Sequence, residues 1–246
     1  MKTDLLSFAF SLIFTTVNYV LGAPVPQTAS PTQVVNSFNL TQSLASPCTK
    51  VITSTFVVTN LNQYLLLSEN AAVDITTQLL LNNFPNSQID LFAPPAYVIF
   101  NKLAPPPDAK LISSLPVRDV LLQVFYHSLG SYLVAVNEAL KTEEQQEIQK
   151  FASSASRRGL QIARQALSDA LCSTKRLLAN ANCSVPKSTT DSLLQLSWYQ
   201  FPINTSTGRF QNHVRQYSLA KGLQAMAATL RSFVKDNATK LSGLMN

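Results

Sequence analysis

The sequence predicts an all-α protein, a four-helix bundle of up-up-down-down topology with two long crossover loops. Three observations support this fold class. Glycine accounts for only 6 of the 246 residues, which is too few for a turn-rich β architecture. The 13 prolines leave three long gaps in which helices are allowed. The last of these gaps carries a long apolar stripe at helical spacing.

The most regular helical pattern runs from Gly208 to Leu241. Its apolar residues recur at steps of three and four, and basic residues fall mostly between them. The apolar positions are Phe210, Val214, Tyr217, Leu223, Met226 or Ala227, Leu230, and Phe233 or Val234. At about 1.5 Å per residue this helix is roughly 45–50 Å long, so partners of similar length must cover its stripe.

The first proline gap, residues 48–84, predicts the first helix of the bundle. Apolar residues follow a helical step from Leu44 to Leu65. A strand is the alternative, because the β-branched run at 51–59 suits a strand by propensity. Helix is favoured, since strict alternation fails at residues 56–58 and no second strong strand follows.

The second gap, residues 117–185, is long enough for two helices. One apolar stripe covers 117–140 and another covers 148–178. The polar segment 141–145 between them is interpreted as a short link, with Thr142 suited to cap the third helix. A link this short joins antiparallel neighbours.

Two longer connections determine the predicted topology. A proline-rich segment spans about 69–114, and a second segment spans about 181–207. Extended chain covers about 3.3–3.6 Å per residue, so either connection can run the full length of a bundle. Two long crossovers around one short turn specify the up-up-down-down arrangement.

The 3 cysteines are consistent with this topology. The start of the first helix lies beside the end of the third, so Cys48 can bridge to Cys172. That bridge closes a loop of about 125 residues and contributes roughly 4–5 kcal/mol through chain entropy. Cys183 lies near the same end and is the alternative partner, and one thiol is left over in either case.

The N-terminus has the pattern of a secretory signal peptide over residues 1–22, with Lys2 followed by an apolar run and small residues. A membrane anchor is the alternative, but the apolar run is shorter than the roughly 20 residues that a span needs. No other segment is expected to cross a bilayer. Residues 23–43 then form an N-terminal extension and residues 44–246 the bundle, and we expect a secreted, soluble product.

Four N-glycosylation sequons fit an extracellular protein, at Asn39, Asn182, Asn204 and Asn237. The formal net charge of +6 is spread along the chain without a run of like charges, so nucleic acid is not an expected partner. The two histidines, His127 and His213, fall in different predicted helices. No nucleophile, acid–base pair or ligand spacing can be assembled, so we expect no catalysis, no metal and no cofactor.

Several short motifs resemble those of a known family. Phe210-Gln211-Asn212-His213 opens the last helix, Pro47-Cys48 precedes the first, Leu129-Gly130-Ser131 lies in the second, and Ala170-Leu171-Cys172 lies late in the third. They are similar to the leukaemia inhibitory factor and ciliary neurotrophic factor subgroup of the interleukin-6-type long-chain four-helix cytokines. That subgroup opens its fourth helix with a phenylalanine followed three residues later by a lysine. The resemblance covers the chain from about Pro47 onwards.

This resemblance implies a secreted cytokine that bridges cell-surface class I cytokine receptors of the glycoprotein-130 and leukaemia-inhibitory-factor-receptor type. Phe210 is implied as an aromatic anchor for one receptor. His213 stands where the family has lysine, so Arg209 or Arg215 is implied as the substitute cation. The outer faces of the first and third helices are implied to bind a second receptor, and we expect a monomer before receptor binding.

Two other interpretations remain open. Phe210 in the first turn of an amphipathic helix also suits a hydrophobic staple at the edge of the core. The alternative function is that of a secreted helical carrier whose amphipathic helices enclose a lipid or another apolar ligand. The low share of charged residues, 13%, is compatible with a carrier.

Overall fold

The computed structural model describes residues 40–45, 56–83, 89, 93–99, 103, 105–148, 156–195 and 205–245. Throughout these ranges the regular structure is helical and contains no strand, so the prediction of an all-α protein is confirmed. The signal peptide, most of the N-terminal extension, Asn39, Cys48 and Asn204 lie outside the described residues.

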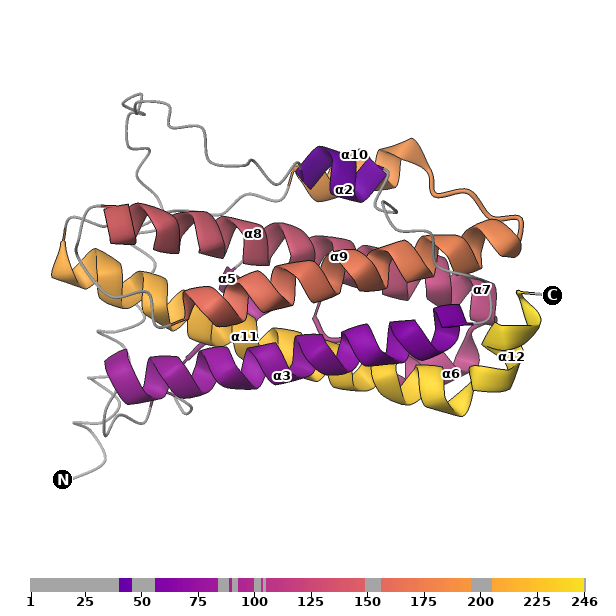
Figure 1. Ribbon diagram of the computed structural model, residues 1–246, viewed down its shortest axis with the longest axis horizontal. Coiled ribbons are helices and arrows are strands. Elements are labelled where there is room, and N and C mark those ends of the chain that lie inside the picture. The colour runs from indigo at the N-terminus through magenta and orange to yellow at the C-terminus, as the bar shows by residue number, and fades with distance from the viewer. Residues whose placement is uncertain are drawn as a thin grey trace, which may run out of the picture. The chain divides into compact units, whose positions relative to one another are not determined.

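Four long helices dominate the described chain: α3 (Val57–Asn83), α8 (His127–Ile148), α9 (Arg157–Asn180) and α11 (Ser206–Asp236). Helix α3 packs against α9 and α11, and α8 packs against the same two helices. Figure 1 shows the four lying side by side along the long direction of the view. Each long helix can therefore bury one stripe against two neighbours.

Helix α8 is extended at its N-terminus by α7 (Val117–Asp119) and by a π-helical segment, η2 (Val120–Tyr126). The helix starts directly after Pro116, whose extended conformation and missing N–H suit a helix start. The aromatic residues of η2 are buried, and the Phe125 ring lies 5.6 Å from the Phe233 ring of α11. This contact joins the start of the second long helical stretch to the end of α11.

The described residues also form short helices around this frame, namely α2 (Leu40–Ala45), α5 (Ala96–Ile99), α6 (Ala109–Ser114), α10 (Lys187–Leu194) and α12 (Ala238–Gly243). Helices α5 and α6 pack on α11, and α12 packs on α11 and α3. Helices α2 and α10 pack on each other and on α8 (Figure 1). The two crossover regions thus carry helical turns of their own.

Helix α2 is tied to the bundle through the carbonyl of Leu44, which accepts a hydrogen bond from the Lys175 ammonium of α9. That ammonium also lies 5.5 Å from the centre of the Tyr126 ring. Burial lowers the pKa of Lys175 to about 8. These helices all belong to the second of two compact units of the chain, residues 39–246.

The first long helix differs from its predicted limits. It is helical at residues 57–59, where a strand was the alternative, and it continues to Asn83 instead of giving way to a crossover near Glu69. Its buried stripe simply continues through Ala72, Ile75 and Leu79. The proline gap was the better guide to this end, because Pro85 stands two residues further on and cannot continue a helix.

The predicted link at 141–145 is wrong, because these residues lie inside α8. Thr142 does not cap a helix: it is buried, and its hydroxyl donates to the Glu138 carbonyl at 3.1 Å. Helix α9 begins at Arg157, later than the expected start directly after Thr142. The connection between these helices falls within 149–155, which lies outside the described residues.

One stretch within the described chain, Val117–Gln145, is long and apolar enough to cross a membrane, contrary to the expectation that no segment after the signal peptide is. In its most apolar 18-residue window, 78% of residues are buried inside the protein. The side chains that raise its hydropathy are therefore the ones that pack against α9 and α11. A buried core helix of a soluble protein has the same properties.

Candidate functional site

The N-terminal end of α11 is built by a side-chain cap. Thr205 is extended, and its hydroxyl oxygen accepts a hydrogen bond of 3.0 Å from the Gly208 amide. The cap satisfies one of the amides that a helix start leaves without an intrahelical partner. It fixes the first two turns of α11, residues 206–213, which we call the tip.

The tip directs Phe210 outward. The side chain is 52% exposed, although it was predicted as the first residue of the apolar stripe. Val214 is only partly buried, and the fully buried stripe begins at Tyr217. Arg209 is partly exposed beside Phe210. An exposed aromatic ring next to a cation is therefore the main surface feature of the tip.

His213 does not share this surface. It is only 9% exposed and faces the interior. Burial, together with the positive charge of Arg209, lowers the pKa of His213 to about 4. The imidazole is therefore neutral at pH 7 and does not supply a surface cation at this position. Arg215 is also buried, so Arg209 is the more exposed of the two predicted substitutes.

A buried polar network lies directly below the tip. The Gln216 side-chain nitrogen donates to Glu143 of α8 at 2.5 Å, and the Ser156 hydroxyl donates to the Gln216 oxygen at 3.0 Å. Glu143 is 2% exposed, and burial raises its pKa, while the hydrogen bonds from Gln216 and Ser156 and the charge of Arg157 act against this shift. Sequence reasoning missed this network, because it placed Glu143 in a solvated link.

A second surface feature lies along α3. Five large apolar side chains of this region are exposed, and the residues between them on the same side of the helix are uncharged except for the partly exposed Asp74, which lies between Leu67 and Leu81. We call this surface the α3 face; its apolar members are Phe56, Leu66, Leu67, Val73 and Leu81. On the neighbouring helix α9, Ile162 is also exposed. An exposed apolar surface of this kind is unusual on a monomer and is typical of interaction sites.

The cysteines and sequons are placed as follows. Cys172 is disulfide-bonded, whereas Cys183 is a free and buried thiol. The predicted partner of Cys172, Cys48, lies outside the described residues. Asn182 is exposed and has a positive φ of 52°, and Asn237 is partly buried at the junction of α11 and α12.

The described residues hold no cluster of three or more histidine, cysteine or acidic side chains that could bind a metal ion. No protein-family model matches the chain, and no curated protein or solved structure is significantly similar to it. The candidate site is therefore defined by its own geometry: an exposed phenylalanine held on a capped helix end above a buried polar network.

Proposed function

We propose that this chain is a secreted helical cytokine that signals by bridging two class I receptors of the glycoprotein-130 and leukaemia-inhibitory-factor-receptor type. The observation that carries the proposal is the exposure of Phe210, 52%, at the start of a 31-residue helix. Exposure of a large aromatic ring to water is unfavourable in free energy. Such a ring is stabilised when it fills a pocket on a partner. Arg209 supplies a neighbouring positive charge that selects and orients the partner.

The proposal includes the up-up-down-down topology of the four long helices. Antiparallel packing of α8 with α11 is supported by two contacts, Phe125 with Phe233 and Glu143 with Gln216. Helices α3 and α9 also run in opposite directions: a Cβ on Gly159, early in α9, would lie 2.6 Å from Ile75, late in α3. The colour gradient along α3, α8, α9 and α11 in Figure 1 agrees with these directions.

The second receptor is proposed to bind the α3 face together with Ile162 of α9. Its exposed leucines and valine make this surface mainly apolar, with Asp74 as an acidic residue among them, so binding depends largely on apolar burial. Helix α3 packs between α9 and α11, so the surface adjoins both neighbours. The tip and the α3 face are separate surfaces, and two separate surfaces are what a bridging ligand requires.

The deciding experiment is Phe210→Ala, tested for binding to receptor ectodomains of this class and for signalling in cells that carry them. We expect binding of the tip receptor to weaken by at least about 2 kcal/mol, roughly thirtyfold, because an anchor is removed. Helicity and thermal unfolding should remain as in the wild type, since the ring is exposed. A variant that signals normally, or that unfolds, contradicts the assignment.

Phe56→Ala is the matched control for tip binding. Phe56 is 57% exposed, close to Phe210 in exposure, but it precedes α3 at the end of the molecule where α12 packs (Figure 1). We expect it to bind the tip receptor like the wild type. Leu66→Glu on the α3 face should lose signalling as Phe210→Ala does, but it should keep binding of the tip receptor.

A carrier of lipid has less support. A pocket among the described residues, between the first crossover and α11, has a volume of about 240 Å³, below the roughly 300–1,000 Å³ of sites for drug-sized ligands. An acyl chain with its headgroup needs more space than this. Mass spectrometry of a solvent extract of the secreted protein tests the alternative, and stoichiometric lipid would favour it.

A further inference from the structure

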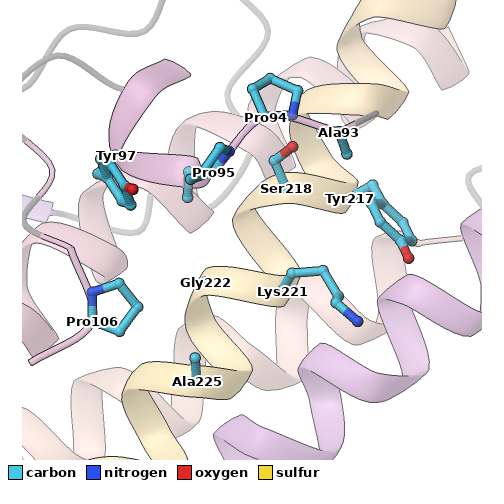
Figure 2. A pocket seen from close by; sticks show the side chains of 11 residues that line it. Ala93, Pro94, Pro95, Tyr97, Pro106, Tyr217, Ser218, Lys221, Gly222 and Ala225 are labelled. Atoms are coloured by element: carbon cyan, nitrogen blue, oxygen red, sulfur yellow. The ribbon is translucent and has the colours of Figure 1, made fainter. Parts of the chain in front are cut away.

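The pocket of about 240 Å³ lies where the first crossover segment passes over the middle of α11. Pro94, Pro95, Tyr97 and Pro106 form its walls on the crossover side, and Ser218 and Gly222 of α11 form its floor. Figure 2 shows Ser218 projecting from α11 towards the proline-rich segment. Its lining is mainly apolar, and it is open to solvent on one side.

The pocket exists because small residues line its α11 side and rigid proline rings line its crossover side. On α11, the small residues Ser218, Gly222 and Ala225 follow one another at steps of four and three, so they share one face of the helix. A Cβ on Gly222 would lie 2.9 Å from the Cβ of Ala96, so glycine allows α5 to approach closely here. Proline rings on the opposite wall are rigid and cannot turn inward to fill the remaining space.

One polar group in this pocket lacks a protein partner. Ser218 is 2% exposed, and its hydroxyl oxygen has no hydrogen bond within the part of the chain that the structure describes. The Tyr132 hydroxyl lies behind Gly222, at 2.6 Å from where its Cβ would be, and it likewise has no hydrogen-bond partner in that part of the chain. Buried hydroxyls are normally satisfied, so Ser218 is a specific anchoring point for a ligand that enters the pocket.

We propose that this pocket binds a small, uncharged aromatic molecule with one hydrogen-bonding group, which pairs with the Ser218 hydroxyl. The size agrees, because an apolar cavity of about 150 Å³ holds benzene and drug-sized ligands need about 300 Å³ or more. Flat proline and tyrosine walls suit an aromatic ring. Ser218 offers a neutral hydrogen bond, which suits an uncharged polar group.

The test is a titration of the intact mature protein with indole, followed by two-dimensional NMR. We expect saturable shifts at the amides of Ser218, Gly222 and Ala96, with a dissociation constant on the order of 1 mM or tighter for so small a ligand. Ser218→Ala should weaken indole binding about two- to tenfold, the value of one neutral hydrogen bond. The exposed Ser232 on the same helix provides the control variant, Ser232→Ala, which should bind as the wild type does.

The hydrogen bond is isolated by a second probe, 1-methylindole, which keeps the rings and lacks the N–H. The wild type should prefer indole over 1-methylindole, and Ser218→Ala should lose that preference. Ala225→Leu, a change at an exposed wall residue, should narrow the pocket and weaken both probes. The proposal fails if binding does not saturate, if the shifts fall on the α3 face, or if both probes bind the wild type equally. None of these outcomes depends on receptor binding, so this site and the proposed function are tested separately.

Discussion

The amide nitrogen of Gln216 donates a hydrogen bond of 2.5 Å to the carboxylate of Glu143, and both side chains are buried. The Gln216 oxygen in turn accepts from Ser156, the residue before α9. One side chain of α11 thus contacts α8 and the start of α9 at the end of the molecule that presents the tip. Because the nitrogen and the oxygen of the Gln216 amide both form hydrogen bonds, the network favours one arrangement of α8, α11 and the start of α9.

Replacing Gln216 should therefore destabilise the fold. Gln216→Met keeps most of the side-chain volume, but it leaves the buried Glu143 carboxylate and the Ser156 hydroxyl without this partner. We expect a loss of about 2–3 kcal/mol in the free energy of unfolding at pH 7, measured by urea denaturation. Gln224→Met, at a partly exposed position of the same helix, should change stability by less than about 0.5 kcal/mol. Equal effects of the two substitutions would refute a structural role for the network.

His213 should make stability depend on pH. Its pKa is lowered to about 4 in the folded protein, against about 6.5 in the unfolded chain, so folding favours the neutral ring. The associated stability is fully present above pH 6.5 and is lost as the pH falls towards 4. The complete shift corresponds to roughly 3 kcal/mol. Urea denaturation at pH 7 and pH 4.5 measures most of this loss.

Glu143 changes the stability with pH in the opposite direction to His213, so the two contributions must be separated in that experiment. Its pKa is raised by burial, so its contribution to stability is greatest at low pH and decreases as the pH rises through the folded value. The His213 contribution is therefore obtained from the difference between wild type and His213→Gln, in which Glu143 is common to both. The variant should lose less stability than the wild type between pH 7 and 4.5. An identical loss in both proteins would show that folding does not lower the pKa of His213.

The limits of the long helices show what the sequence could and could not predict. Proline marks a boundary by its own covalent structure, so the end of α3 before Pro85 and the helix start after Pro116 were predictable. The continuation of α8 through Thr142 and Glu143 was not. Thr142 bonds to the Glu138 carbonyl of its own helix, but Glu143 is satisfied by Gln216 of α11. A local sequence pattern contains no information about such a distant partner.

The candidate site was predictable only in part, for a related reason. Helical spacing places Phe210 and Tyr217 on nearly the same side of a helix, but it does not say where along that side the neighbouring helices stop covering it. The exposure of Phe210 and the burial of His213 both depend on how far α3 and α8 reach beside α11. The α3 face is similar, since its mainly apolar and uncharged composition is visible in the sequence but its exposure is not.

Asn182 should carry a glycan more readily than Asn237. Asn182 is exposed in the loop after α9, where its positive φ of 52° turns the chain away from the helix. The Asn237 side chain instead donates to the Phe233 carbonyl at 3.1 Å and helps to end α11. In protein secreted from eukaryotic cells, Asn182→Gln should reduce the mass by one glycan and Asn237→Gln should not. The reverse pattern of mass loss would contradict this assignment of the two sites.

Gly159 should be essential to the contact between α9 and α3. A Cβ at this position would lie 2.6 Å from Cγ1 of Ile75 and 3.4 Å from the Ala71 carbonyl oxygen. Ile75 is buried and β-branched, so it cannot move aside freely. Gly159→Ala gains about 1 kcal/mol from helix propensity but incurs about 1–3 kcal/mol from overpacking, so we expect a net loss of stability.

Gly243→Ala is the matched control for this substitution. Gly243 ends α12 and does not have a positive φ, and a Cβ added to it would have no described neighbour within 4 Å. With overpacking absent, the propensity gain should remain, and the free energy of unfolding should stay the same or rise slightly. The comparison separates the two effects, because both variants add the same methyl group to a helical glycine. If Gly159→Ala proved as stable as Gly243→Ala, the close approach of α9 to α3 at this position would be wrong.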